Sequence, residues 1–396
     1  MVATLAGVAQ GTTTTTLAPA TDAQISSFTV TARQLGDFDD SPPRIDSPAA
    51  IVVNQDTGRV LYEWDAYEQR RMASTTKIMT AILVLENMDL STNITVSKKA
   101  AETIEPKYWL REGDVLTTED FLYALMLRSA NSAAVVLAEG CAGSVEAFAE
   151  MMNAKAAELG MKDTHFVNPN GLDAEGHYST PADMATLARY AMQNEKFREI
   201  VQTEEYTVQL PGRSSTLTFT NTNKLLTRDS WVTGIKTGLT PKAEQCLVAS
   251  ATRDGVSVIS VVLGQPVSSL CFDESETLLD YGLDQYKHVT LMESGTAVAE
   301  ATVPYRLDGV VQLVAESTLE MDLYKDDTVT AAVVIDRPLV LPVAAGDPFG
   351  RVTLTVEGEV VGEVDLVATA SYDEITLGSK VAYYFKRLGR WLGGLV

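Results

Sequence analysis

The chain has 396 residues, more than one hydrophobic core usually holds, so we expect two folded domains plus terminal segments. Hydrophobic residues make up 45% and charged residues 21% of the sequence, which excludes a disordered or collagen-like chain. The 53 acidic residues outnumber the 31 basic ones, and the net charge of −22 argues against a nucleic-acid partner, because phosphates would be repelled. The three cysteines provide no dense disulfide framework and no C-x-x-C pair.

The first 45 residues predict a leader remnant followed by a flexible linker that is low in core-forming side chains. Met1 to Ala9 are small and apolar but lack a basic segment, which is typical of the tail of a truncated signal peptide and suggests export. The threonine run Thr12–Thr16 and the Ser41-Pro42-Pro43 stretch indicate a flexible linker. We expect no packed fold in residues 1–45.

Residues 46–287 predict an α+β domain. Residues 51–62 read as a β-hairpin, and the segment 74–85 is apolar almost all round, which predicts a helix buried in the interior. Further helix starts follow at Thr117, Ser144 and Thr180, each a capping residue before a helical apolar pattern. The alternating run 246–263, broken by Asp254-Gly255, predicts a second hairpin. Strands, then helices, then strands indicate one antiparallel sheet with a helical block, and we expect the active site between them.

Three short motifs occur in this domain in a fixed order: Ser74-Thr75-Thr76-Lys77, Ser129-Ala130-Asn131 and Lys236-Thr237-Gly238. The first places a hydroxyl and an amine one helical turn apart, so that a neutral lysine can take the serine proton during attack on a carbonyl. S-x-x-K alone is too loose to be diagnostic, but the ordered set predicts an acyl-transfer site.

Residues 288–375 lack helix signals and predict a small all-β sandwich domain. Short alternating segments such as 310–314 and 352–356 read as strands, the latter followed by a Glu357-Gly358 turn. No cluster of histidine, cysteine or paired acids has metal-ligand spacing here, so we expect a spacer or packing module and no metal.

Residues 376–396 predict an amphipathic helix. Its apolar face carries Val381, Tyr384, Phe385, Leu388, Trp391, Leu392 and Leu395, and its opposite face carries Lys386, Arg387 and Arg390. The segment is too short and too charged to span a bilayer, so we expect it to lie on an anionic membrane surface. The alternative is a helix docked on the β-domain.

Together these motifs resemble the low-molecular-weight penicillin-binding proteins that act as D-alanyl-D-alanine carboxypeptidases. The stretches 73–81, 168–172 and 247–251 also look like family blocks in the family order, as does Tyr178-Ser179 with Asp183-Met184. The resemblance implies a β-lactamase/transpeptidase-like domain that removes terminal D-alanine from peptidoglycan stem pentapeptides without a cofactor. It also implies β-lactam antibiotics as covalent inhibitors and a peripheral location on the outer face of the bacterial cytoplasmic membrane.

The resemblance assigns roles to the first two motifs. Ser74 would be the acylated nucleophile and Lys77 its general base. Ser129 would relay the proton to the leaving amine, and Asn131 would hydrogen-bond the backbone of the substrate.

It assigns the third motif to substrate binding. Lys236 would supply positive potential, Thr237 would contact the substrate along the edge strand, and Gly238 would let it approach closely. The backbone N–H groups of Ser74 and Leu239 would form the oxyanion hole.

The sequence departs from the family pattern at three positions. Cys271 stands where an arginine is usual in the family, and that arginine is thought to hold the terminal carboxylate of the substrate. Either the alignment slips at this position, or Lys236, Thr237 or another cation takes the carboxylate, or recognition of the terminal D-alanine is weakened. Glu244 replaces a usual glycine and Met72 a common proline, and neither touches a reacting group.

Other functions stay open on the sequence alone. A β-lactamase-like hydrolase needs an added acid for deacylation, for which Glu175 is the obvious candidate. A D,D-endopeptidase would use the same chemistry, and a non-catalytic penicillin-sensing or wall-binding module would need none of it. A Ser-His-Asp triad would require His165, His177 or His288 to lie beside the serine.

Overall fold

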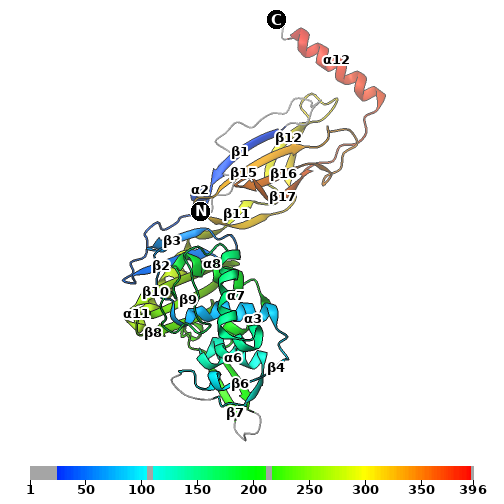
Figure 1. The fold of residues 1–396 in the computed structure, drawn as a ribbon. Coiled ribbons are helices and arrows are strands. Elements are labelled where there is room, and N and C mark those ends of the chain that lie inside the picture. Colours follow the sequence, from blue (N-terminus) through cyan, green and yellow to red (C-terminus); the bar gives the residue numbers. More distant parts are fainter. Residues whose placement is uncertain (1–24, 105–109, 211–215, 394–396) are drawn as a thin grey trace. The chain divides into compact units, whose positions relative to one another are not determined.

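The structure is a computed structural model that describes residues 25–104, 110–210 and 216–393. The described residues divide into two compact units, one formed by residues within 40–284 and the other by residues 285–393 together with 25–39 (Figure 1). The first unit contains both helices and strands, and the second is built from strands with a helix at the C-terminus. The predicted fold class, an α+β domain followed by an all-β domain and a terminal helix, is confirmed.

A five-stranded antiparallel sheet forms the centre of the first unit. Its order is β3-β2-β10-β9-β8, so the first and last strands of the unit share one sheet as predicted. The strands are β2 (Ala49–Asn54), β3 (Val60–Trp64), β8 (Val232–Thr240), β9 (Glu244–Arg253) and β10 (Val256–Gln265). All six residues of β2 are buried, because both faces of the sheet are covered.

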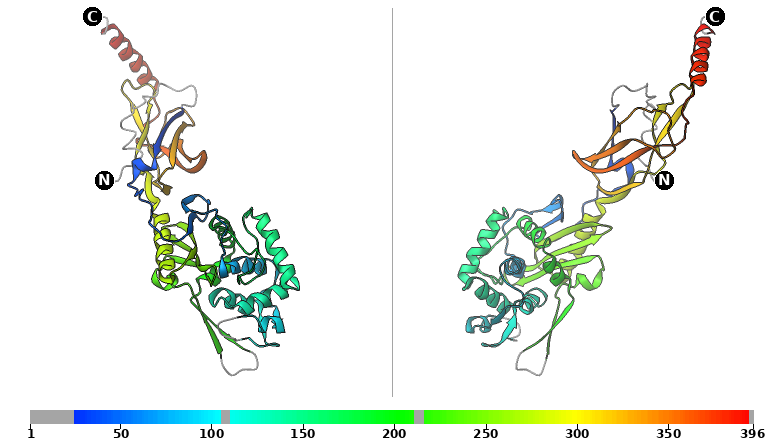
Figure 2. Two further views of the ribbon diagram at one scale, coloured as in Figure 1. Left: turned by 60° about the vertical axis from the view of Figure 1, so that its left-hand side comes forward. Right: turned by 90° about the vertical axis from the view of Figure 1, so that its right-hand side faces the viewer.

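Helices cover the two faces of this sheet unequally. Ile51 and Val53 belong to the large core shared with the helical block, whereas Val52, on the other face, lies against Gly282 of α11. In Figure 2, α11 lies on one side of the sheet and the cyan-to-green helices on the other. The helices are α3 (Lys77–Asn87), α4 (Lys98–Ala101), α5 (Thr118–Leu127), α6 (Asn131–Ala142), α7 (Val145–Glu158), α8 (Pro181–Ala191), α9 (Glu195–Gln202), α10 (Leu225–Arg228) and α11 (Ser268–Asp284). Two small hairpins complete the unit: β4 (Asn93–Thr95) with β5 (Val115–Thr117), and β6 (Glu205–Gln209) with β7 (Thr216–Thr220).

The predicted helix starts are confirmed by their caps. Thr117 and Asp120 form a reciprocal capping box at the start of α5. The hydroxyls of Ser144 and Thr180 accept hydrogen bonds from the third residues of α7 and α8. Within the described ranges, no single helix has the length and apolarity needed to cross a membrane, and only the adjoining pair α6 and α7, bent by 83°, meets that test when taken together.

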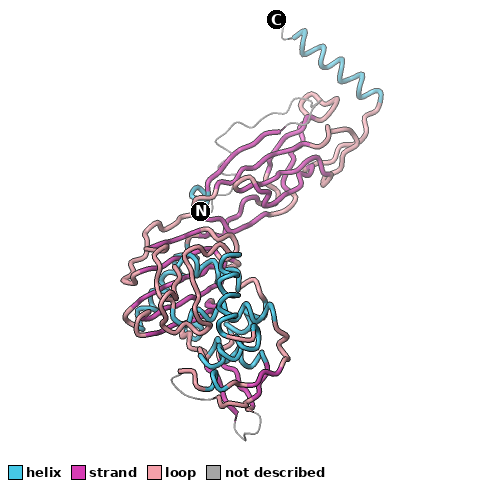
Figure 3. The backbone as a smooth tube through the Cα atoms, in the orientation of Figure 1, coloured by secondary structure: helices cyan, strands magenta, loops and turns pink. Residues whose placement is uncertain are grey.

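The second unit has its own core between a six-stranded and a two-stranded antiparallel sheet. The larger sheet has the order β1-β15-β16-β17-β13-β12, and the smaller pairs β11 with β14. Strands make up most of this unit, as the magenta segments of Figure 3 show. They are β1 (Ile25–Thr31), β11 (Tyr286–Met292), β12 (Ala297–Thr302), β13 (Val310–Ala315), β14 (Leu319–Tyr324), β15 (Thr328–Ile335), β16 (Pro348–Val356) and β17 (Glu359–Ala368).

The prediction of an unpacked linker up to residue 45 is wrong for part of that segment. Strand β1 pairs with β15 along its whole length, and the short helix α2 (Ala32–Leu35) follows it. Val30, Ala32 and Leu35 are buried in the second core, which explains why this stretch is ordered. A strand from the N-terminus thereby covers an edge of β15 that would otherwise be unpaired. The leader-like residues 1–9 and the threonine run lie outside the described residues.

Helix α12 (Leu377–Gly393) follows the strands of the second unit. Its apolar side chains are exposed, with Phe385 at 71% and Trp391 at 65% of their full accessibility. The helix also contacts the β-domain, and Tyr384 of its apolar face lies edge-on to Tyr305. Arg390 forms a two-pronged ion pair with Asp308, and Tyr383 packs edge-on against Tyr305. Leu395 lies outside the described residues.

Candidate active site

The first motif lies where a 3₁₀ turn leads into a buried α-helix. The turn spans Ala73–Thr76 and continues directly into α3, whose first residue is Lys77. Side chains three residues apart eclipse each other in a 3₁₀ turn, so the hydroxyl and the amine face one another. Lys77 Nζ lies 2.9 Å from Ser74 Oγ. The lysine side chain is fully buried, so its amine cannot swing into solvent.

Two asparagines also lie beside the lysine amine. Asn131 begins α6, and its Oδ1 lies 2.8 Å from Lys77 Nζ. The backbone carbonyl of Asn170 lies 2.5 Å from the same nitrogen and 3.4 Å from Ser74 Oγ. The amine is therefore held between three oxygen atoms that come from separate parts of the chain.

Ser129 lies in the connection between α5 and α6, two residues before Asn131. It adopts a left-handed backbone conformation with φ of 59°, which is uncommon outside glycine and asparagine. In the described part of the chain, no hydrogen bond joins its hydroxyl to Ser74 or Lys77. The structure thus places Ser129 beside a site residue without linking it directly to the Ser74–Lys77 pair.

The third motif lies on β8, an edge strand that packs against the serine turn. A Cβ atom added at Gly238 would lie only 3.0 Å from Ser74 N and 3.1 Å from Met72 O, so glycine allows the close contact. Thr237 Oγ1 is 2.7 Å from Thr222 Oγ1. The outer edge of β8 has no strand paired to it in the described sheet, and Leu239 on this strand is 62% exposed.

Lys236 is almost completely buried, and its Nζ donates a 2.9 Å hydrogen bond to Thr237 O. Burial disfavours the ammonium ion and lowers the pKa of Lys236 to about 7. Near neutral pH the side chain is thus poised between its charged and neutral forms. The structure brings Lys236, Thr237 and Gly238 to the serine turn through this strand.

The loop of residues 168–171, which the sequence analysis did not assign to the site, packs against the serine turn. Gly171, with φ of +84°, lies against the peptide before the serine, and a Cβ there would be 1.9 Å from Ala73 O. Asn168 Oδ1 accepts from Gly171 N at 2.7 Å, and Thr80 Oγ1 donates to Pro169 O at 2.6 Å. The Asn-Pro-Asn-Gly sequence of this loop was the available signal, because these residues favour tight turns.

The residues that the alternative functions would use have other partners or are exposed, and His288 lies 3.1 Å from Asp322 on the β11–β14 pair. His177 hydrogen-bonds Thr76 rather than Ser74, and His165 Nδ1 bonds Gly176 O. Glu175 is exposed, and no described hydrogen bond connects it to Ser74. Burial raises the pKa of the Cys271 thiol far above its ordinary value, so this side chain provides no charge for a substrate.

An antiparallel sheet flanked by helices, with a serine and a lysine paired at the start of a buried helix, is the arrangement of the penicillin-binding serine hydrolases. A family model described as D-alanyl-D-alanine carboxypeptidase matches residues 37–267, and a model of the C-terminal domain of penicillin-binding protein 5 matches residues 286–374. The chain belongs to the D-alanyl-D-alanine carboxypeptidase family and is a serine-type peptidase.

Individual relatives agree with this assignment. D-alanyl-D-alanine carboxypeptidase DacF of Bacillus subtilis (strain 168) is 30% identical over 355 residues, which cover 87% of this chain and 90% of that protein. A D-alanyl-D-alanine carboxypeptidase of Streptomyces sp. (strain K15) is 35% identical over 256 residues, covering 61% and 88%. The solved structure of D-alanyl-D-alanine carboxypeptidase DacD from Francisella tularensis superimposes with a TM-score of 0.60 at 26% identity, covering 85% of this chain and 95% of that chain. The resemblance inferred from the motifs is confirmed.

Proposed function

We propose that this enzyme removes the terminal D-alanine from peptidoglycan stem pentapeptides through an acyl-enzyme on Ser74. The observation that carries the proposal is the 2.9 Å distance between Ser74 Oγ and the buried amine of Lys77. A hydroxyl is a weak nucleophile until a neighbouring base takes its proton, and this amine is the group placed to do so. The names of the curated relatives supply the substrate class.

In the first step, Ser74 Oγ attacks the carbonyl carbon of the penultimate D-alanine while its proton moves to Lys77 Nζ. Asn131 Oδ1 and Asn170 O then accept hydrogen bonds from the new ammonium group, at 2.8 and 2.5 Å. Hydrogen bonds to a charged group are stronger than neutral ones, so the same contacts gain strength as the charge develops. Asn131 has a second role in this scheme, since its amide also bonds the substrate backbone.

The negative oxygen of the tetrahedral intermediate is bound by two backbone N–H groups, those of Ser74 and Leu239. Both lie where β8 packs on the serine turn, next to Gly238. The substrate lies along the open edge of β8, where Thr237 contacts it, and its terminal carboxylate is held by the positive potential of Lys236. This cation takes the role for which Cys271 is unsuited.

In the next step the carbon–nitrogen bond breaks, Ser129 gives its proton to the leaving nitrogen and takes in return the proton held by Lys77 Nζ, so D-alanine is released and the rest of the peptide stays as an ester on Ser74. Water then attacks the ester on Ser74, one of its protons returns to Ser74 Oγ, and the shortened peptide leaves with a new terminal carboxylate. Bicyclic β-lactams enter by the same attack on their carbonyl and form a stable ester, so we expect covalent inhibition.

The test is incubation of the protein with a pentapeptide ending in D-alanyl-D-alanine and measurement of the D-alanine released. Stoichiometric release of one D-alanine per peptide is the expected result. A protein that binds penicillin but releases no D-alanine would be a sensor, and one that turns over penicillin rapidly but spares the peptide would be a β-lactamase.

We propose further that α12 places the enzyme on the outer face of a bacterial cytoplasmic membrane. Its apolar side chains, including Phe385 and Trp391, are exposed, while Lys386 and Arg387 on the other side are exposed cations. An apolar face combined with cations suits an anionic lipid surface better than a docked position. Deleting residues 380–396 should abolish binding to vesicles that contain phosphatidylglycerol and leave turnover of a soluble pentapeptide unchanged. Vesicle binding that survives the deletion would contradict this role.

A further inference from the structure

A chain of hydrogen bonds connects His177, which the mechanism does not use, to the peptide bond between Ala73 and Ser74. Thr76 Oγ1 donates to Ala73 O at 2.8 Å and lies 2.9 Å from His177 Nε2. Since a hydroxyl has one proton, which goes to Ala73 O, Nε2 must be the donor to Thr76. Val167 N independently donates to His177 Nδ1 at 3.0 Å, which requires the same tautomer. The donor order is thus Val167 to His177 to Thr76 to Ala73.

This chain ends on the carbonyl of the peptide whose N–H belongs to Ser74. That peptide is trans and planar, so its C=O and N–H point in opposite directions, and fixing one fixes the other. Ala73 has φ of 47°, a conformation that side chains other than glycine rarely adopt. A peptide in such a conformation needs support from its surroundings to persist.

We propose that His177 is a positioning residue for catalysis: acting through Thr76, it orients the Ala73–Ser74 peptide so that Ser74 N–H points at the carbonyl oxygen of the substrate. This inference rests on the proposed acyl-enzyme chemistry and assigns to it a residue outside the three motifs. It also explains why a neutral ring is required. Protonation of His177 Nδ1 would place its N–H against the N–H of Val167, and the hydrogen bond between these two groups would be lost.

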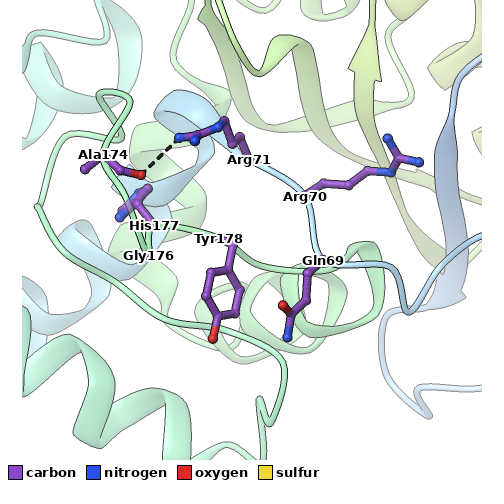
Figure 4. Close-up of a pocket in the computed structure, with 7 residues that line it drawn as sticks. All are labelled: Gln69, Arg70, Arg71, Ala174, Gly176, His177 and Tyr178. Carbon is purple, nitrogen blue, oxygen red and sulfur yellow. Dashed lines mark hydrogen bonds between the residues drawn. The ribbon is translucent and has the colours of Figure 1, made fainter.

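The surroundings of His177 keep it neutral. The side chain is 4% exposed, lies edge-on to Phe166, and lines a cavity of about 230 Å³ next to Arg71 (Figure 4). Burial lowers the pKa of His177 to about 4, with further lowering from His165 and Arg71 and an opposing effect from Asp173. At neutral pH the ring therefore acts as a fixed donor and acceptor, and it exchanges no proton during turnover.

Two pairs of variants separate the orienting role from a merely structural one. Thr76→Val removes the hydroxyl at similar volume, and Thr76→Ser keeps it. His177→Asn keeps an acceptor near the position of Nδ1 and loses the donor to Thr76, whereas His177→Gln keeps a donor near the position of Nε2. Loss of an oxyanion donor costs on the order of 10²–10³-fold in rate, so a misdirected donor should cost about 10- to 100-fold.

The measurement is the acylation rate constant with a fluorescent penicillin, separated from the binding constant, on full-length protein. We expect Thr76→Val and His177→Asn to acylate about 10- to 100-fold more slowly with binding constants within about threefold of wild type. Thr76→Ser and His177→Gln should recover most of the rate. The double variant of Thr76→Val and His177→Asn should be no slower than either single one, because both break the same chain.

Wild-type acylation rates in folded Thr76→Val and His177→Asn would overturn the inference, as would additive losses in the double variant. If Thr76→Val does not fold, the comparison of His177→Asn with His177→Gln decides alone. The proposed function fails separately, namely if the wild-type protein forms no acyl-enzyme or releases no D-alanine.

Discussion

Gly171→Ala tests whether the asparagine loop holds the serine turn in place. The new Cβ would lie 1.9 Å from Ala73 O and 2.9 Å from Ser74 N, whereas real contacts of this kind begin near 3.0 Å. The carbonyl or the loop must therefore withdraw by about 1 Å. Overpacking of this kind costs about 1–3 kcal/mol, and the left-handed φ adds about 1–2 kcal/mol for a residue with a side chain. A misplacement of about 1 Å also costs on the order of 10²-fold in rate.

Gly176→Ala, in the same loop, is the matched control. Its φ is +77°, but a Cβ there would meet nothing closer than 3.7 Å, so it carries the backbone strain without the clash. We expect both variants to lose stability in urea unfolding, with Gly171→Ala losing about 1–3 kcal/mol more. Only Gly171→Ala should acylate slowly with a fluorescent penicillin. Equal stabilities and equal acylation rates for the two variants would refute the reasoning.

Three further predictions concern β8 and the buried histidine. Gly238→Ala brings a Cβ to 3.0 Å from Ser74 N and should slow acylation at least about tenfold with little change in unfolding midpoint, as stopped-flow labelling and urea titration would report. Burial lowers the pKa of Lys236 to about 7, so its ammonium form is lost as pH rises. KM for a peptide with a free terminal carboxylate should therefore increase between about pH 6 and 8. A KM that does not change with pH would show that Lys236 does not bind the carboxylate. His177 has a folded pKa of about 4 against 6.5 ordinarily, so its contribution to stability is complete above pH 6.5 and is lost as pH falls toward 4. Unfolding free energies should show a loss of up to about 3 kcal/mol over this range that His177→Asn lacks, and an identical pH slope in both proteins would contradict it.

Local rules in the sequence predicted the elements that carry the three motifs. The hairpin 51–62 and the second hairpin across Asp254-Gly255 follow from alternation and turn residues, and the helix starts at Thr117, Ser144 and Thr180 follow from capping chemistry. These features depend on residues close together in the chain. The pairing of Ser74 with Lys77 belongs to the same group, since both lie on one turn.

The parts that the sequence did not predict depend on distant partners or on backbone atoms. Strand β1 is ordered by its pairing with β15, some three hundred residues away, and although its β-branched and aromatic residues favour a strand, they do not indicate this partner. The backbone carbonyl of Asn170 lies beside Lys77 Nζ. Every residue has a backbone carbonyl, so no side-chain pattern in the sequence could indicate this contact. His177 acts through Thr76, and only the folded loop brings the two together.

The most direct test of the account is the mass of the protein after reaction with benzylpenicillin, followed by mapping of the modified peptide. We predict one penicilloyl adduct, located on Ser74, and no adduct on a folded Ser74→Ala variant. An adduct on another residue, or one that persists in Ser74→Ala, would contradict the assignment of Ser74 as the nucleophile.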